Sequence, residues 1–99
     1  MIIYNVTVLI DYATEEEWVK WMKEIHIPEV MATNCFIEYK FCKILAESEG
    51  GNSYSIQYSA ENRDILDKYS EEFSTELQQK HKAKFDGKFV AFRTLLEVI

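Results

Sequence analysis

Glycine and proline are scarce in this sequence. Its 99 residues include three glycines, Gly50, Gly51 and Gly87, and one proline, Pro28. Without a glycine-rich stretch, the chain cannot form the loops that hold phosphate groups in nucleotide-binding proteins. Hydrophobic residues make up 47% of the chain and aromatic residues 14%, which is typical of a globular fold. At this length we expect one domain, over residues 1–99.

The sequence contains fewer basic residues than acidic ones. Eleven Lys and Arg face 17 Asp and Glu, so the formal net charge is −6. Nucleic acids bind to basic patches that neutralise their phosphates, and we therefore expect no nucleic-acid partner. No apolar run is long enough to span a bilayer, and the first residues lack the positive charge that opens a secretory signal. We expect a cytoplasmic protein with no membrane partner.

Cysteine is limited to Cys35 and Cys42. Both fall in one expected strand at an odd spacing, too far apart and on opposite faces, so they cannot form an intrachain disulfide. Free thiols are typical of a reducing compartment. No CxxC or HExxH spacing exists, and His26 and His81 belong to separate elements. We therefore expect no metal site and no cofactor.

Alternation of apolar and polar residues predicts four strands. They are expected over residues 2–11, 35–46, 53–59 and 88–99, with a hairpin turn at 49–52. Apolar residues at helical spacing predict one helix that begins with a Thr14–Glu17 capping box and another over about 61–84. Pro28 predicts a break at His26–Ile27 and a short helical piece after it.

The order of these elements predicts an α+β fold. A βαββαβ chain with right-handed crossovers forms a ferredoxin-like, four-stranded antiparallel sheet with two helices on one face. In the last strand, alternation predicts that Val90, Phe92, Leu96 and Val98 face the helices. The helix-free face is then expected to carry Asn5, Thr7, Leu9, Phe36, Glu38, Lys40, Cys42, Ile44, Gln57, Arg93, Leu95 and Glu97.

That helix-free face is too apolar for a solvated surface, and exposed apolar area of this extent indicates a partner. Two copies that pack face to face would form a homodimeric α/β barrel, which is one alternative, and a monomer with a semi-polar wet face is the other. The candidates for the dimer face are Glu38, Lys40, Gln57, Arg93 and Glu97. We expect Arg93 to pair with Glu38 or Glu97 there.

Aromatic residues are expected to converge between the sheet and the helices. They form either a pocket for a flat or apolar ligand or an ordinary packed core. The pocket candidates are Trp18, Trp21, His26, Tyr54, Tyr58 and Phe92. His26 and His81 each have two interpretations, either as an acid–base group or haem ligand beside the aromatic cluster, or as a hydrogen-bonded residue at a helix end. His26 is the best catalytic candidate because the expected helix break would aim it at a cavity.

Four stretches resemble an uncharacterised bacterial family known only as domain of unknown function 4286. They are Met1–Val8, His26–Thr33, Tyr54–Tyr58 and Lys88–Thr94. The resemblance extends over essentially the whole chain and implies no activity. More distantly, the βαββαβ plan is similar to the dimeric α/β-barrel group, which includes antibiotic-biosynthesis monooxygenases, haem-degrading monooxygenases and stress-response barrel proteins.

The haem-degrading members of that group use an Asn on the first strand, a Trp on the sheet and a His on the second helix. Asn5 and His81 match two of these positions, but Asn5 is expected to face away from the helices and no strand holds a Trp. We do not transfer that activity, since likeness of fold alone does not assign function.

Three hypotheses for function remain. The first is a homodimeric barrel protein of unknown role that binds a small hydrophobic ligand or none. The second is a cofactor-independent monooxygenase or isomerase acting on a small aromatic or hydrophobic substrate, with His26 as its base. The third is a protein-interaction module. A cavity of about 300 Å³ or more beside Trp18, Trp21 and His26 would favour the first two.

Overall fold

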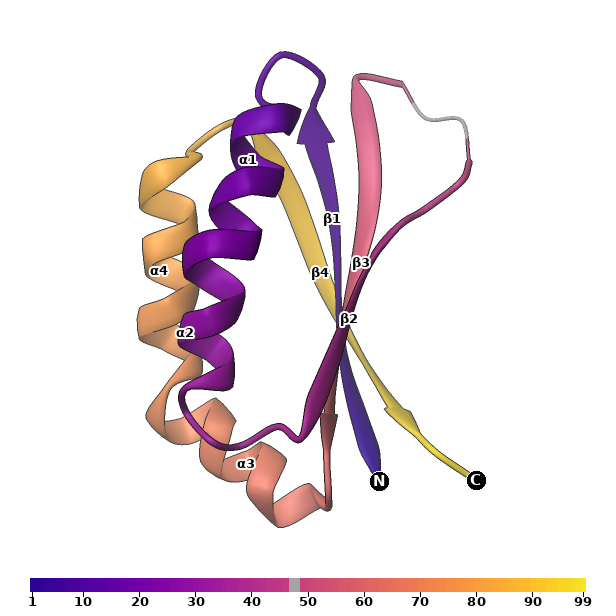
Figure 1. Cartoon of the computed structure of the whole chain (residues 1–99), viewed down its shortest axis with the longest axis vertical. Coiled ribbons are helices and arrows are strands. Elements are labelled where there is room, and N and C mark those ends of the chain that lie inside the picture. The colour runs from indigo at the N-terminus through magenta and orange to yellow at the C-terminus, as the bar shows by residue number, and fades with distance from the viewer. Residues whose placement is uncertain (47–48) are drawn as a thin grey trace.

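The structure is a computed structural model that describes residues 1–46 and 49–99. Helices pack on one face of a twisted sheet, and the other face is left bare (Figure 1). The elements are β1 (Ile2–Asp11), α1 (Glu15–Trp21), the π-helical turn η1 (Met22–His26), α2 (Ile27–Met31), β2 (Glu38–Lys43), β3 (Gly51–Ala60), α3 (Arg63–Glu72), α4 (Ser74–Lys84) and β4 (Phe89–Glu97).

The sheet is antiparallel throughout, with the strand order β2-β3-β1-β4. The two central strands, β1 and β3, pair over their whole length from Ile2 opposite Ala60 to Asp11 opposite Gly51. The predicted βαββαβ plan is confirmed, with β2 and β4 as edge strands. No helix in the described ranges is long and apolar enough to cross a membrane. The expected cytoplasmic location and the expected absence of a nucleic-acid partner stay predictions.

Aromatic and branched side chains fill the core between the sheet and the helices. On β1 and β3, alternate residues are buried, as their period-two pattern predicts. Their helix-facing side chains meet Trp18, Met22, Leu66 and Tyr69 from the helices. The core residues of the two central strands are Tyr4, Val8, Ile10, Tyr54, Ile56, Tyr58 and Ala60.

The predicted faces of β4 are wrong by one residue. Arg93 lies opposite Val6, whereas Phe92 lies opposite Thr7. Arg93 therefore shares the helix face, and Phe92 lies on the bare face with 60% of its surface exposed. Apolar residues occupy both faces of this strand, so periodicity does not show which face packs against the helices. The pairing of β4 with β1 determines it. The reversal also applies to Val90, Leu95, Leu96, Glu97 and Val98.

This register changes the expected dimer face. Arg93 and Glu97 are absent from the bare face, so the predicted pairing of Arg93 with Glu38 or Glu97 on that face is wrong. Glu38, Lys40 and Gln57 do lie there, as predicted. Another residue expected there faces the core, because the ring of Phe36 stacks on Tyr4.

The bare face has an apolar half and a polar half. Its apolar half lies on β1 and β4, where Asn5, Thr7 and Thr94 lie among the apolar residues, and its polar half lies on β2 and β3. The apolar half consists of Ile3, Leu9, Val90, Phe92 and Leu96. The polar half consists of Glu38, Lys40, Cys42, Ser55 and Gln57.

The expected helix break at His26–Ile27 does not occur. Ile27 keeps helical angles (φ −61°, ψ −44°), and the chain runs through η1 into α2 without interruption. Pro28 cannot donate to the preceding turn and its ring crowds the carbonyl four residues back. A π-helical turn just before it widens the helix there, which accounts for its continuity.

Three other boundaries differ from the prediction. The second helix is divided at Phe73 (φ −126°, ψ −34°) into α3 and α4. The second strand is shorter than residues 35–46, and Cys35 is buried ahead of it. The Thr14 side chain makes no capping hydrogen bond. Cys35 and Cys42 are both free thiols, as predicted.

Candidate functional site

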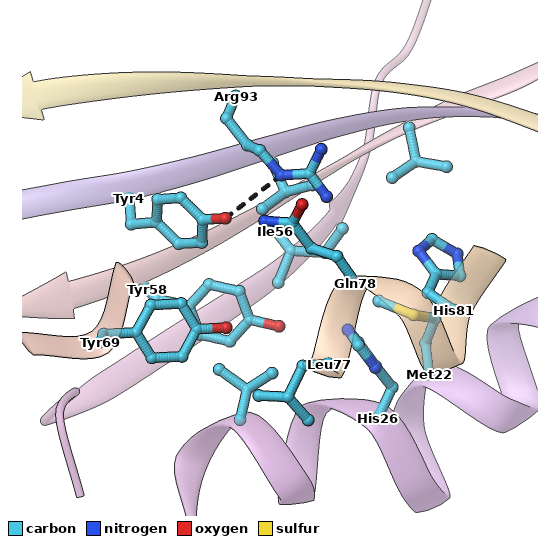
Figure 2. Close-up of a pocket in the computed structure, with 13 residues that line it drawn as sticks. Tyr4, Met22, His26, Ile56, Tyr58, Tyr69, Leu77, Gln78, His81 and Arg93 are labelled. Carbon is cyan, nitrogen blue, oxygen red and sulfur yellow. Dashed lines mark hydrogen bonds between the residues drawn. The ribbon is translucent and has the colours of Figure 1, made fainter. Parts of the chain in front are cut away.

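A cavity lies at the centre of the space between the sheet and the helices (Figure 2). Every major layer contributes to its wall, since lining residues come from β1, β3, β4, η1, α2, α3 and α4. The apolar lining residues are Val6, Val8, Met22, Val30, Ile56 and Leu77, and the polar ones are Tyr4, His26, Tyr58, Tyr69, Gln78, His81 and Arg93.

The cavity is narrow. The hollow measures about 380 Å³ out to its open mouth, and about 20 Å³ of it can take the centre of a water molecule. One water needs about 10–15 Å³ by this measure, whereas ligand pockets begin at about 300 Å³. In this conformation the cavity has room for a single water, and neither Trp18 nor Trp21 lines it. It therefore does not reach the size of about 300 Å³ that would favour a ligand or substrate.

His26 brings a nitrogen without a partner to this cavity. It is the last residue of η1, and its ring stacks on Trp21 with centroids 4.9 Å apart. Its Nδ1 is buried and has no hydrogen-bond partner in the described part of the chain. Burial lowers the pKa of His26 to about 4, with Glu29 opposing the shift and Arg93 adding to it. The ring is therefore neutral at physiological pH.

His81 lines the same cavity, and its Nε2 has a hydrogen-bond partner. It is 3% exposed on α4, and its Nε2 accepts a hydrogen bond of 2.9 Å from Trp18 Nε1. Its ring also stacks on Phe89 at a centroid distance of 4.1 Å. Burial lowers the pKa of His81 to about 3, with further contributions from His26 and Arg93. The bond from Trp18 holds this ring in the neutral form that carries its proton on Nδ1.

Among the described residues that line the cavity, Arg93 alone carries a charge. Its Nε donates a hydrogen bond of 3.2 Å to Tyr4 Oη (Figure 2). No Asp or Glu lines the cavity. Burial raises the pKa of the Tyr58 and Tyr69 hydroxyls well above their usual range, so both stay protonated and can donate. The cavity thus combines an apolar wall with hydrogen-bond donors and one cation.

The structure brings only some of the predicted pocket residues together. His26 and Tyr58 line the cavity. Trp18 and Trp21 lie behind it, in contact with the two histidines. Phe92 is on the bare face of the sheet, so its assignment to the pocket is wrong.

The prediction missed several lining residues. Tyr4 and Tyr69 are not among the predicted pocket candidates, and nothing in the pattern of α4 marks Gln78. Arg93 was placed on the wrong face. A charged side chain inside the apolar stretch 89–96 was the available signal for it, because charged residues inside strands need a specific partner.

The last of the pocket candidates, Tyr54, belongs to a second polar cluster at the end of the sheet. Tyr54 Oη donates to Glu15, and Asn52 Nδ2 donates to both of its carboxylate oxygens at 2.9 and 3.0 Å. Lys43 lies 3.9 Å away. The hydrogen bonds from Tyr54 and Asn52 hold the pKa of Glu15 below its usual value, while burial and Glu15 raise the pKa of Tyr54 to about 12.

Neither cluster resembles a metal centre. In residues 1–46 and 49–99, no three His, Cys, Asp or Glu side chains come together in a way that could hold a metal ion.

Solved structures share this fold at low sequence identity. The chain is similar to an ethyl tert-butyl ether D (EthD) family protein from Bacillus halodurans, with a TM-score of 0.73 and 13% identity over 100% of both chains. It is similar to HapK from Hahella chejuensis, with a TM-score of 0.73 and 11% identity over 100% of this chain and 93% of that one. These likenesses establish the fold alone.

A third similar structure is described as a dimeric ferredoxin-like protein, from an uncultured marine organism. Its TM-score is 0.69 and its identity 14%, over 99% of this chain and 94% of that one. The predicted ferredoxin-like α+β class is confirmed by this likeness. No curated protein matches the chain. A family model matches residues 1–99 from end to end, and the chain therefore belongs to the family described as a domain of unknown function, DUF4286.

Proposed function

We propose that this chain is a homodimeric barrel protein that binds one small molecule in the cavity between its sheet and its helices. The observation that supports this most is the buried Nδ1 of His26, which has no partner among the described residues. A buried polar atom left without a hydrogen bond costs about 1–3 kcal/mol. Native proteins keep few such atoms, and those they keep are often functional.

The wall around His26 suits a ligand with an apolar body and a polar group. Val6, Met22 and Ile56 offer apolar surface, and Tyr58 and Tyr69 offer hydroxyl donors. Ligand sites in proteins are mostly apolar with a few converging polar groups, which is the composition found here.

Entry of a ligand requires side chains to move. Arg93 is exposed and Gln78 is half-buried, and both are long side chains with several rotamers. In Figure 2, Gln78 reaches toward Arg93 across the cavity. Movement of these two side chains would enlarge the cavity while the strands and helices keep their places.

Tryptophan fluorescence tests this proposal directly. Trp21 stacks on His26 and Trp18 is bonded to His81, so a ligand beside the histidines alters the emission of both indoles. We expect a saturable change with at least one compound in a panel of small aromatic acids, quinones, fatty acids and haem. His26→Leu should weaken that response about tenfold, and Ile25→Leu, on the exposed neighbouring residue, should not. A flat response across the panel contradicts the proposal.

The apolar half of the bare face supports the homodimer. Val90 and Phe92 are 66% and 60% exposed on the edge strand β4, and exposed apolar surface of this kind usually marks an interface. A structural neighbour is described as dimeric. We propose that a second copy of this chain covers the apolar half.

Light scattering tests the dimer. The native chain should have twice the 11.7 kDa mass of one copy. Phe92→Lys should halve that mass, because it places a charge in the centre of the interface. Ile25→Lys, a matched change on the exposed helix surface, should leave the mass unchanged. A native particle of one chain would contradict this proposal.

A second candidate function uses the same nitrogen of His26 as a base in a cofactor-independent oxygenase or isomerase. The observation in its favour is a neutral imidazole with an unpartnered Nδ1 beside the cavity. However, a pKa of about 4 makes this a weak base, and general bases work best with a pKa near the operating pH. Binding is therefore the better supported function. Turnover of a bound compound that is lost in His26→Gln, with binding retained, would establish catalysis instead.

A further inference from the structure

Arg93 has no counter-charge in the described structure. It takes part in none of the ion pairs between described residues, and no carboxylate lines the cavity. Glu29, the acid whose charge acts most on His26, is itself bound by Lys80 at 2.9 Å. Arg93 is exposed at the mouth of the cavity, so water solvates its charge, and an anion that enters the cavity can replace that water at the guanidinium.

The hydrogen bond to Tyr4 orients this cation. Only the Nε of Arg93 is used, at 3.2 Å from the Tyr4 hydroxyl oxygen. The two terminal nitrogens extend beyond the bond, over the cavity (Figure 2). Two parallel N–H groups of a guanidinium match the two oxygens of a carboxylate, and this paired geometry makes Arg the preferred carboxylate ligand.

The other polar groups of the wall can donate to an anion without competing for Arg93. Tyr4 accepts from Arg93 with its oxygen and keeps its own O–H to donate. Tyr58 and Tyr69 line the same cavity with hydroxyls, and Gln78 with an amide. Neither histidine carries a charge at neutral pH. Arg93 is therefore the single charged anchor among several neutral donors.

We infer that the ligand of this cavity is a small organic acid whose carboxylate binds Arg93 and whose apolar body lies between the sheet and η1. This inference rests on the proposed binding function and narrows it to one chemical class. In this conformation the cavity takes about one water, so the side chains of Arg93 and Gln78 must move to admit even a small monocarboxylic acid with a single ring or a short chain. The apolar residues Val6, Met22 and Ile56 would contact that body.

Pairs of acids and amides of equal shape test the inference. Benzoate and benzamide, and hexanoate and hexanamide, are titrated by tryptophan fluorescence and calorimetry into the native dimer. We expect each acid to bind about tenfold or more tightly than its amide, which is the value of one good charged hydrogen-bond pair. Arg93→Gln should remove that advantage, because the affinity for the acid should fall much more than the affinity for the amide, whereas Arg93→Lys should keep part of it.

A matched control separates the cavity from general surface charge. Arg63 is an exposed arginine on α3 that is paired with Asp67, and Arg63→Gln should not change the affinity for either acid. Equal affinities for acid and amide, or acid binding unaffected by Arg93→Gln, overturn the inference and leave the binding function intact. An equal loss in Arg63→Gln also overturns it. If neither acids nor amides bind the native protein, the inference and the proposed function both fail.

Discussion

Two polar clusters lie on the helix side of the same sheet, and they differ in how their groups are partnered. At one end, the Glu15 carboxylate receives hydrogen bonds from Asn52 and Tyr54, with Lys43 nearby. At the centre, His26 has a buried nitrogen without a partner and Arg93 a charge without a counter-charge, both among the described residues.

This contrast separates stability from function. A fully hydrogen-bonded network contributes to folding and specifies one arrangement of α1 against the end of β3. An incomplete set of partners lowers stability and persists where something else completes it, such as a water or a ligand. The Glu15 cluster is thus expected to act on folding alone, and the central cavity on binding.

The largest expected effect is a fall in the free energy of unfolding in mild acid, caused by the two histidines that line the cavity. The pKa values of His26 and His81 lie near 4 and 3 in the folded chain, below the ordinary 6.5. The unfolded chain therefore binds more protons below about pH 6.5, and stability falls as the pH drops. At about 1.4 kcal/mol per pKa unit, the loss from about pH 7 to about pH 5 is on the order of a few kcal/mol, measured by urea unfolding.

The Glu15 cluster responds in a separate pH range. Its carboxylate has a lowered pKa when folded, so its contribution is present above the ordinary value of 4.5 and is lost only below it. The slope of the free energy of unfolding against pH gives the number of protons that the chain takes up when it unfolds. Near pH 5 this number should be about two for the native chain and about one for His26→Leu. A native slope near zero at that pH would show that the histidines are not buried in the neutral form.

A smaller loss is expected from breaking the Glu15 cluster. Glu15→Ala leaves the Asn52 amide and the Tyr54 hydroxyl without their acceptor, at a cost of about 1–3 kcal/mol in the free energy of unfolding. Glu16 is exposed on the same helical turn, and Glu16→Ala should change stability by about 0.5 kcal/mol or less. Equal effects of the two changes in urea unfolding would mean that the network contributes nothing beyond helix charge.

The fold could be predicted because each of its two central strands alternates regularly between apolar and polar residues. On β1 and β3, alternation agrees with burial at Tyr4, Val8, Ile56 and Tyr58. The helices also follow from spacing, since Trp18 and Trp21 are buried. Local pattern and tertiary packing agree at these places, and such agreement makes a sequence predictable.

The polar clusters could be predicted only in part, because the positions of their residues depend on tertiary contacts as well as on local pattern. Arg93 reaches the cavity through the register of β4 against β1, and apolar residues on both faces of that strand conceal the register. His26 was found from its position before Pro28, although the cause is a π-helical turn and not the expected break. Glu15 is not among the predicted site residues, because nothing local indicates Asn52 and Tyr54 as its partners.

The smallest expected effect is also the one that distinguishes the two histidines. His26→Leu removes a polar atom that has no partner and keeps apolar volume against Trp21, so stability at about pH 7 should stay equal or rise by up to about 1 kcal/mol. His81→Leu, on the same cavity, leaves the Trp18 N–H without its acceptor and should destabilise by about 1–3 kcal/mol. Urea unfolding of both variants in the absence of ligand measures the difference. If His26→Leu destabilised the fold as much as His81→Leu, the nitrogen of His26 would have a structural partner, and the central cavity would differ little from the Glu15 cluster.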